Sequence, residues 1–118
     1  MSKQIGQQQE LQACNYLIAQ GLQLLEQNYR CKSGEIDLVM ADQDTLVFVE
    51  VRHRKQNDYG NGLESITRSK QRKIISAAQH YLQAYNLTNK FACRFDIVIT
   101  KPTNDQQFLW IKDAFWVK

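Results

Sequence analysis

Two carboxylates stand out because each interrupts a stretch that otherwise predicts a buried strand. Asp37 lies inside residues 35–41 (EIDLVMA), and Glu50 lies near the end of residues 45–51 (TLVFVEV). A carboxylate in such a place costs free energy unless it is paired or binds a cation. Both residues are therefore candidate functional groups. Each has a plainer interpretation when taken alone, because Asp37 could cap a turn and Glu50 could end an edge strand in solvent.

The turn between these two strands decides whether the carboxylates meet. A two-residue loop at positions 43–44 places Asp37 directly opposite Glu50. With a three-residue loop, Asp37 faces Val49 and Glu50 becomes its diagonal neighbour. Directly opposed residues share a sheet face, with Cβ atoms about 5 Å apart. Two carboxylates that close repel each other unless a cation lies between them, and such oxygen ligands suit Mg²⁺ or Mn²⁺.

Two further residues extend this candidate site. Arg52 follows Glu50 by two positions, so on a strand both side chains share one face. A cation there could stabilise charge on a scissile phosphate. Glu10 lies at the edge of the apolar stripe of the first predicted helix, and it reaches the site if that helix packs across this face of the sheet.

The elements that position these residues follow from hydrophobic periodicity, with Gly21 ending the first helix. The pattern predicts helices over residues 7–20 and 67–85, strands over residues 22–29, 35–41, 45–51, 91–100 and 107–111, a loop over residues 53–62 and a turn at residues 102–105. Short turns make the first three strands a meander, and the second helix is long enough to return the chain to the same sheet. The strand at 45–51 is apolar on both faces, which predicts a central position. Residues 1–118 are expected to form a single domain.

The basic residues are concentrated in one segment. The net charge of the chain is only +3, but residues 52–73 carry seven basic side chains against two acidic ones. Such a segment suits a polyanion, although an ordinary solvated helix face is the alternative. Contacts with a nucleic-acid backbone would weaken with salt and carry no sequence specificity. The residues expected to make them are Arg54, Lys55, Arg68, Lys70, Arg72 and Lys73.

Composition argues against several classes of protein. No apolar run approaches the ~20 residues of a membrane span, and the N-terminus lacks the apolar stretch of a signal peptide, so a cytoplasmic protein without a membrane partner is expected. The three cysteines lack metal-ligand spacing and are expected to be reduced thiols. No P-loop or dinucleotide fingerprint is present, so no small-molecule cofactor is expected. Trp110, Phe115 and Trp116 are expected to be packing aromatics rather than base-stacking ones.

The stretch NYRCKSGEIDLVMADQDTLVFVEVRHR resembles the signature of the YraN-like family of small bacterial proteins. The resemblance continues in YGNGLESITRSKQRKIISAAQHYL and in RFDIVIT, and it covers nearly the whole chain from Glu10 onward. These proteins are classed with restriction-endonuclease-like nucleases and are distantly similar to archaeal Holliday-junction resolvases. The resemblance implies an α/β fold with a restriction-endonuclease-like αβββαβ core, a central mixed sheet flanked by helices, and a metal-dependent phosphodiesterase site.

Carried over by position, the resemblance implies that Asp37 and Glu50 are the two acidic ligands and that Glu10 is the acidic residue of the first helix. Gln71 matches a polar position that orients a ligand or a phosphate. Arg52 stands where related nucleases usually have a lysine. Arginine cannot act as a base, so turnover depends on whether that position acts on water or only stabilises charge. A second departure is the absence of the glycine expected before Glu10.

Three hypotheses follow. The leading one is a DNA endonuclease for branched or structured DNA, in which Asp37, Glu50 and Glu10 hold Mg²⁺ or Mn²⁺ and Arg52 stabilises the developing charge. Cutting a two-fold symmetric junction would favour a homodimer. The second is a non-catalytic nucleic-acid-binding module of the same fold, which has lost activity through Arg52. The third is a structural or adaptor protein whose acidic pair is merely solvated.

Overall fold

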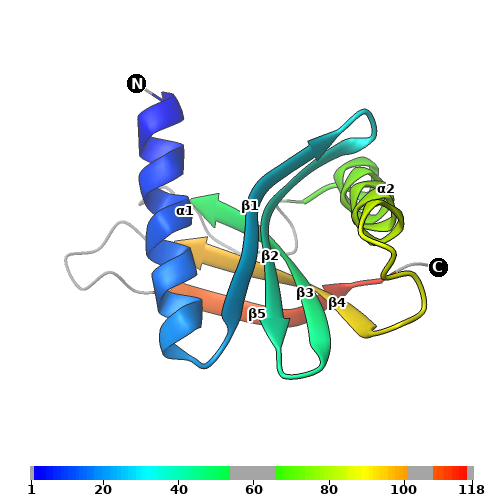
Figure 1. Cartoon of the computed structure of the whole chain (residues 1–118). Coiled ribbons are helices and arrows are strands. Elements are labelled where there is room, and N and C mark those ends of the chain that lie inside the picture. The colour runs from blue at the N-terminus through cyan, green and yellow to red at the C-terminus, as the bar shows by residue number, and fades with distance from the viewer. Residues whose placement is uncertain (1, 54–65, 101–107, 117–118) are drawn as a thin grey trace.

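Helices lie against both faces of a five-stranded sheet in the computed structural model, which describes residues 2–53, 66–100 and 108–116, with side chains from residue 7 onward (Figure 1). The predicted turn at 102–105 and all of the predicted loop except His53 lie outside these residues. In chain order the elements are α1 (Ser2–Ala19), β1 (Gln23–Cys31), β2 (Gly34–Asp42), β3 (Thr45–His53), α2 (Arg68–Ala84), β4 (Ala92–Thr100) and β5 (Phe108–Phe115).

The strands lie in the sheet in their chain order, from β1 to β5. The pairs β1–β2 and β2–β3 are antiparallel, which confirms the meander. β3 and β4 are parallel, because α2 carries the chain back along the sheet between them, and β5 is antiparallel to β4. The result is the expected mixed α/β sheet with an αβββαβ order of elements.

The turn between β2 and β3 has the two-residue loop that brings the carboxylates together. Asp42 pairs with Thr45 and Leu38 pairs with Val49, so the three-residue alternative is wrong. Gln43, the first loop residue, adopts a left-handed φ of 56° that lets the chain reverse so tightly. Continued by one residue, this register sets Asp37 against Glu50 at the point where the ladder ends.

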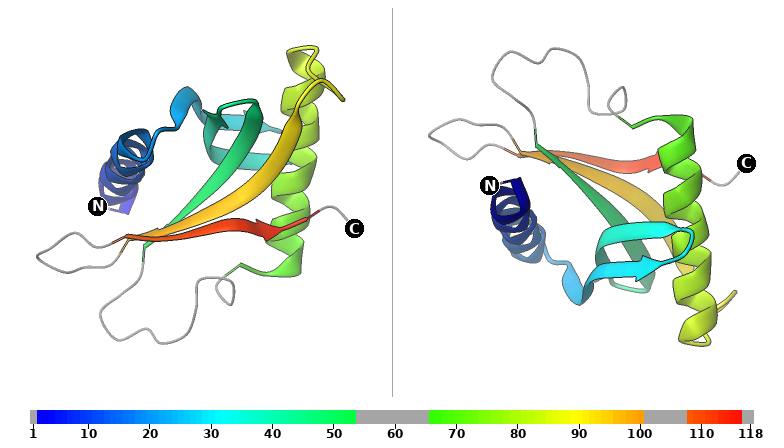
Figure 2. Two further views of the ribbon diagram at one scale, coloured as in Figure 1. Left: turned by 90° about the horizontal axis from the view of Figure 1, so that it is seen from below. Right: turned by 90° about the horizontal axis from the view of Figure 1, so that it is seen from above.

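The core has two parts, one on each face of the sheet, and Figure 2 shows α1 and α2 on opposite sides. Ala77 and Tyr81 of α2 pack with Phe48 of β3, whereas Leu17 of α1 packs with Val47. β3 is therefore buried on both faces, as its apolar pattern predicts. Among the described helices, none is long and apolar enough to cross a membrane.

Local sequence explains most of the helix boundaries. Gly21 has a φ of 103° and follows the end of α1 as expected, since glycine pays no Cβ penalty there. Thr67 caps α2, and its Oγ1 accepts a hydrogen bond from the Lys70 backbone at 3.1 Å. Several predicted limits are wrong. His53 belongs to β3 and not to the predicted loop, because the parallel pairing with β4 extends to it. α1 begins at Ser2, because its first turns are polar helix formers without an apolar period, and β5 reaches Phe115 by continuing past a bulge opposite β4.

Candidate active site

Asp37 and Glu50 form the centre of the candidate site, as their register predicts. The Glu50 side chain is buried, and the two carboxyl groups are joined by a hydrogen bond. Asp37 Oδ2 also accepts a hydrogen bond from the Val51 backbone N–H at 2.8 Å. That bond holds the Asp37 carboxylate against β3, at the end of the β2–β3 ladder. Two carboxyl groups joined by a hydrogen bond share a proton, so Asp37 and Glu50 form an acidic pair whose two groups titrate together.

Burial is the main reason why both carboxyls resist ionisation. Burial and, after it, repulsion from Asp37 raise the pKa of Glu50 to about 8, although the charge of Lys70 opposes the shift. Burial also raises the pKa of Asp37, against the lowering effect of its bond from Val51. The protein therefore does not fully compensate the two negative charges that this site carries when both groups are ionised.

Lys70 supplies a positive charge at this site from the first turn of α2. Its Nζ lies 3.4 Å from Glu50 Oε1, and its side chain is partly exposed whereas that of Glu50 is not. The sequence analysis placed Lys70 only among the residues that grip a nucleic-acid backbone. No local pattern shows this pairing, because twenty residues separate Lys70 from Glu50, although the capping residue Thr67 does mark where the helix starts.

The pair opens into a cavity of about 380 Å³ between α2 and the sheet. Lys70, Lys73 and Ser69 line it from the helix, and Glu35 lies beside Asp37 on β2. The helix approaches closely here, since a Cβ built on Gly34 would lie 2.9 Å from the Lys73 carbonyl oxygen. A glycine at the start of β2 therefore lets α2 bring its lysines over the carboxylates.

Glu10 joins the same group of carboxyls from α1. Burial and, after it, the charge of Asp37 raise the pKa of Glu10 to about 7, against the lowering effect of a hydrogen bond from Asn28. A hydrogen bond also links Glu10 to Asp37. The positive charge of Arg52 lowers the pKa of Glu50 slightly, against the dominant effect of burial. The structure thus places both predicted residues within reach of the acidic pair.

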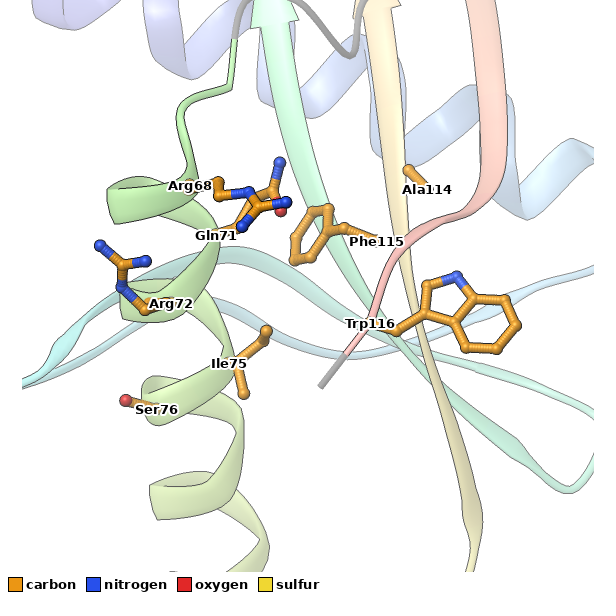
Figure 3. A pocket seen from close by; sticks show the side chains of 8 residues that line it. All are labelled: Arg68, Gln71, Arg72, Ile75, Ser76, Ala114, Phe115 and Trp116. Carbon is orange, nitrogen blue, oxygen red and sulfur yellow. The ribbon is translucent and has the colours of Figure 1, made fainter. Parts of the chain in front are cut away.

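Three other predicted residues lie around a second cavity, on the opposite side of α2. Arg68, Gln71 and Arg72 line this space together with residues at the end of β5 (Figure 3). Gln71 Nε2 donates a hydrogen bond to the Ile66 carbonyl at 3.2 Å. The structure therefore does not bring Gln71 into the wall of the acidic cavity, where its predicted role would have put it. The predicted backbone contacts Arg54 and Lys55 lie outside the described residues.

The donor set of the acidic pair fits a hard divalent cation. Mg²⁺ is usually held by one or two protein carboxylates together with waters, and Asp37 and Glu50 supply that number. A cation would also supply the positive charge that the raised pKa of Glu50 indicates is lacking. Among the described residues, no group of three or more His, Cys, Asp or Glu side chains is already arranged as a ligand set. Glu10 accordingly lies next to Asp37 as an additional acidic group and is not part of a preformed set of three ligands.

Asp96 is a buried carboxylate that the sequence analysis did not single out. It lies on β4 beside Val49, so it faces α1 and not the acidic cavity. Arg94 Nε lies 3.1 and 3.2 Å from its two oxygens, and the Trp110 indole N–H and the Asp113 backbone N–H each donate a hydrogen bond at 2.9 Å. This carboxylate is neutralised by its own fold, and it holds the bulge of β5. The sequence RFD carries a signal for this pairing, since residues two apart on a strand share a face.

The aromatic residues near the C-terminus divide into two groups. Trp110 bonds to Asp96 and contacts Tyr16 edge-on, and Phe115 is buried and stacks on Phe95 at 5.1 Å. Both are packing residues, as expected. Trp116 is 65 % exposed, so the same expectation is wrong for it, because it follows the last residue of β5 and leaves the sheet.

The fold and the site together define an α/β domain in which an acidic pair and a lysine lie at the end of the β2–β3 ladder of a mixed sheet. The chain belongs to the family described as "Uncharacterised protein family UPF0102", which it matches over residues 9–100. It is 47 % identical over 114 residues to a UPF0102 protein of Nitrosococcus oceani, covering 96 % of this chain and 92 % of the relative. A UPF0102 protein of Psychromonas ingrahamii is 53 % identical over 108 residues, covering 90 % and 84 %. One of Stutzerimonas stutzeri is 49 % identical over 115 residues, covering 97 % and 96 %.

Proposed function

We propose that this protein is a metal-dependent DNA endonuclease whose active site is built on Asp37 and Glu50. The observation that carries the proposal is the pairing of the buried Glu50 carboxyl with the half-buried Asp37 carboxyl at the wall of an open cavity, with Lys70 beside Glu50. A structural ion pair would not need a second carboxylate, and burying one costs free energy. The resemblance to restriction-endonuclease-like nucleases supports the same reaction. A cytoplasmic location and a DNA partner are part of this proposal.

The reaction is hydrolysis of a phosphodiester bond. The oxygen of a water molecule bonds to phosphorus, the bond from phosphorus to the sugar oxygen breaks, and the leaving oxygen takes up a proton. A bound Mg²⁺ or Mn²⁺ would supply Lewis acidity at the phosphate and promote deprotonation of the attacking water. Asp37 and Glu50 would hold that cation, and Glu10 would complete the acidic set.

Lys70 can fill the role of the lysine that related nucleases usually have at the position of Arg52. Its ammonium lies beside Glu50, at the mouth of the cavity, where a phosphate could approach it. A lysine can either stabilise charge or exchange a proton, whereas arginine can only stabilise charge. We assign to Lys70 the contact with the scissile phosphate, and to Arg52 the support of the ionised form of Glu50.

The deciding experiment is a cleavage assay on linear duplex, single-stranded and four-way-junction DNA, with Mg²⁺, Mn²⁺ or EDTA. Wild-type protein should cut in a metal-dependent manner, and Glu50→Ala should not. Lys70→Gln should lose about a hundredfold in rate, the effect of removing one preorganised charged donor. Lys73→Gln is the matched control, because Lys73 lines the same cavity one turn further along α2. A loss in Lys73→Gln equal to that in Lys70→Gln would contradict the assignment of Lys70.

A non-catalytic nucleic-acid-binding module is the second candidate. The observation in its favour is the ion pair of Glu50 with Lys70, which compensates part of the acidic charge without a metal. This candidate predicts salt-sensitive binding of DNA with no cleavage under any metal condition. Equal binding at low and high salt, with no cleavage, would contradict both candidates and leave the adaptor hypothesis.

A further inference from the structure

The second cavity, on the other side of α2, has the features of a nucleotide-binding pocket. Its volume is about 710 Å³, and it lies between the first turns of the helix and the end of β5 (Figure 3). Arg68 and Gln71 extend into this region from the helix, toward Phe115 of β5. Ile75 and Phe115 contribute apolar surface, and none of the described residues that line the cavity is acidic. An anionic ligand with a flat apolar part fits such a lining.

The indole of Trp116 adds a flat surface at the rim of this pocket. It is 65 % exposed, and its N–H donates a hydrogen bond to the Asp113 carbonyl at 3.3 Å, which fixes the ring over the end of the strand. Figure 3 shows the ring turned away from α2, so it lies beside the pocket rather than inside it. A base that leaves the pocket in this direction could stack on the ring.

The pocket and the acidic cavity share one helix as a wall. Lys70 and Lys73 face the acidic cavity, whereas Arg68, Gln71 and Arg72 face the pocket. A helix with its side chains is about 10–12 Å across, so a strand that occupies both sides needs only a few nucleotides to cross the first turns of α2. The basic residues of these turns would follow its phosphates.

We propose that this pocket binds unpaired nucleotides of the nucleic-acid substrate, next to the scissile phosphate. The bases of a continuous duplex are stacked on each other and hide their faces, whereas an unpaired base can enter an apolar pocket or stack on an aromatic ring. The inference rests on the proposed function and narrows its substrate to DNA with a single-stranded segment, such as a flap, a fork or an overhang.

The test is the binding of fluorescently labelled DNA by full-length protein in EDTA, where no cleavage takes place. Three probes of equal length are compared at one salt concentration: blunt duplex, duplex with a single-stranded overhang, and single strand. Wild-type protein should prefer the two probes with unpaired bases by about tenfold, the effect of one stacked base. Trp116→Ala and Ser76→Tyr should abolish that preference, the first by removing the stacking surface and the second by filling the pocket from α2 without a change in charge.

Lys90→Gln is the control, because Lys90 is an exposed cation just beyond the far end of α2. It should leave the preference unchanged, and circular dichroism should show that all variants are folded. Equal binding of the three probes by wild-type protein, or a preference that survives both pocket variants, would overturn the inference. The proposed function fails separately, if the wild type prefers unpaired DNA in EDTA but never cleaves it with Mg²⁺ or Mn²⁺.

Discussion

Glu50 and Asp96 lie on the neighbouring strands β3 and β4, and both are buried, but they face opposite sides of the sheet. Asp96 receives a guanidinium and two N–H donors from its own fold, and it holds the bulge of β5 in place. Glu50 instead faces a second carboxyl, and the charges of Lys70, at 3.4 Å, and of Arg52 do not offset the effects of burial and of Asp37 that raise its pKa. The comparison shows that burial alone does not mark a functional carboxylate. A shortage of compensating positive charge beside a cavity does so better.

The largest expected effect is on activity, at the carboxylates that lack compensation. Asp37→Ala should reduce cleavage by at least about 10²–10³-fold, because a charged group of the active site is lost. The same variant should weaken Mn²⁺ binding, measured by isothermal titration calorimetry, and leave the circular dichroism spectrum unchanged. Cleavage at the wild-type rate would show that the acidic pair is not the active site.

Asp96→Ala should have the opposite effect, because it should reduce stability and leave activity largely unchanged. Removing this carboxylate leaves the partly buried Arg94 guanidinium with Asp42 as its remaining ion-pair partner, and it leaves the Trp110 and Asp113 N–H groups without their acceptor. Hydrogen bonds to a charged group contribute about 1.5–3 kcal/mol each, so the loss of these two should cost at least about 3 kcal/mol. Urea denaturation followed by circular dichroism measures that loss. Cleavage per folded molecule should change little, since Asp96 faces away from the acidic cavity. A stable Asp96→Ala protein without activity would reverse the roles given to the two regions.

A smaller effect is expected where α2 approaches the site. Gly34→Ala places a Cβ about 2.9 Å from the Lys73 carbonyl oxygen, so the helix must shift. The cost should be about 1–3 kcal/mol, as for other overpacked contacts. The shift moves Lys70 away from Glu50 and should lower the cleavage rate without changing metal affinity. Gly21→Ala is the control for the loss of a glycine, because a Cβ there meets nothing within 4 Å, and strain from its φ of 103° affects stability only.

A gradual effect, spread over several pH units, is expected in the pH dependence of stability in the absence of metal. The pKa of Glu50 is about 8 in the folded chain and 4.5 when unperturbed, because burial and Asp37 disfavour its charged form. Between these values the folded chain binds more protons than the unfolded chain, so the free energy of unfolding should fall as pH rises from about 4.5 to 8. Thermal unfolding across this range measures the slope, which Glu50→Gln should flatten. An increase in stability with pH in wild type, attributable to Glu50, would contradict the raised pKa.

Addition of Mn²⁺ sharpens the same measurement. A cation that binds the folded chain only should raise the melting temperature at pH 8, where its ligands are ionised most easily. Glu50→Gln should lose this response, whereas Asp96→Asn should keep it because Asp96 is already neutralised by Arg94. Equal responses in the two variants would place the metal site elsewhere.

Local patterns in the sequence were enough to predict the elements and the central feature of the site. Period-two and period-3.6 hydrophobicity predicted the strands and helices. The sequence left two loop lengths open between β2 and β3, and the structure has the two-residue loop that sets Asp37 against Glu50. These relations hold over short separations along the chain, where backbone geometry leaves few alternatives. Membership of the UPF0102 family also follows from the sequence, since the match extends over residues 9–100.

The tertiary structure alone decided that Lys70 compensates Glu50. Lys70 reaches Glu50, and Gln71 turns to a different cavity, because the packing of α2 against Gly34 and the sheet sets the rotation of the helix. The crossover from β3 to β4 runs through α2, so spacing along the sequence does not determine which residues of the two strands pair. Side-chain partners across it are therefore determined by the packing of the two core clusters and not by any local spacing.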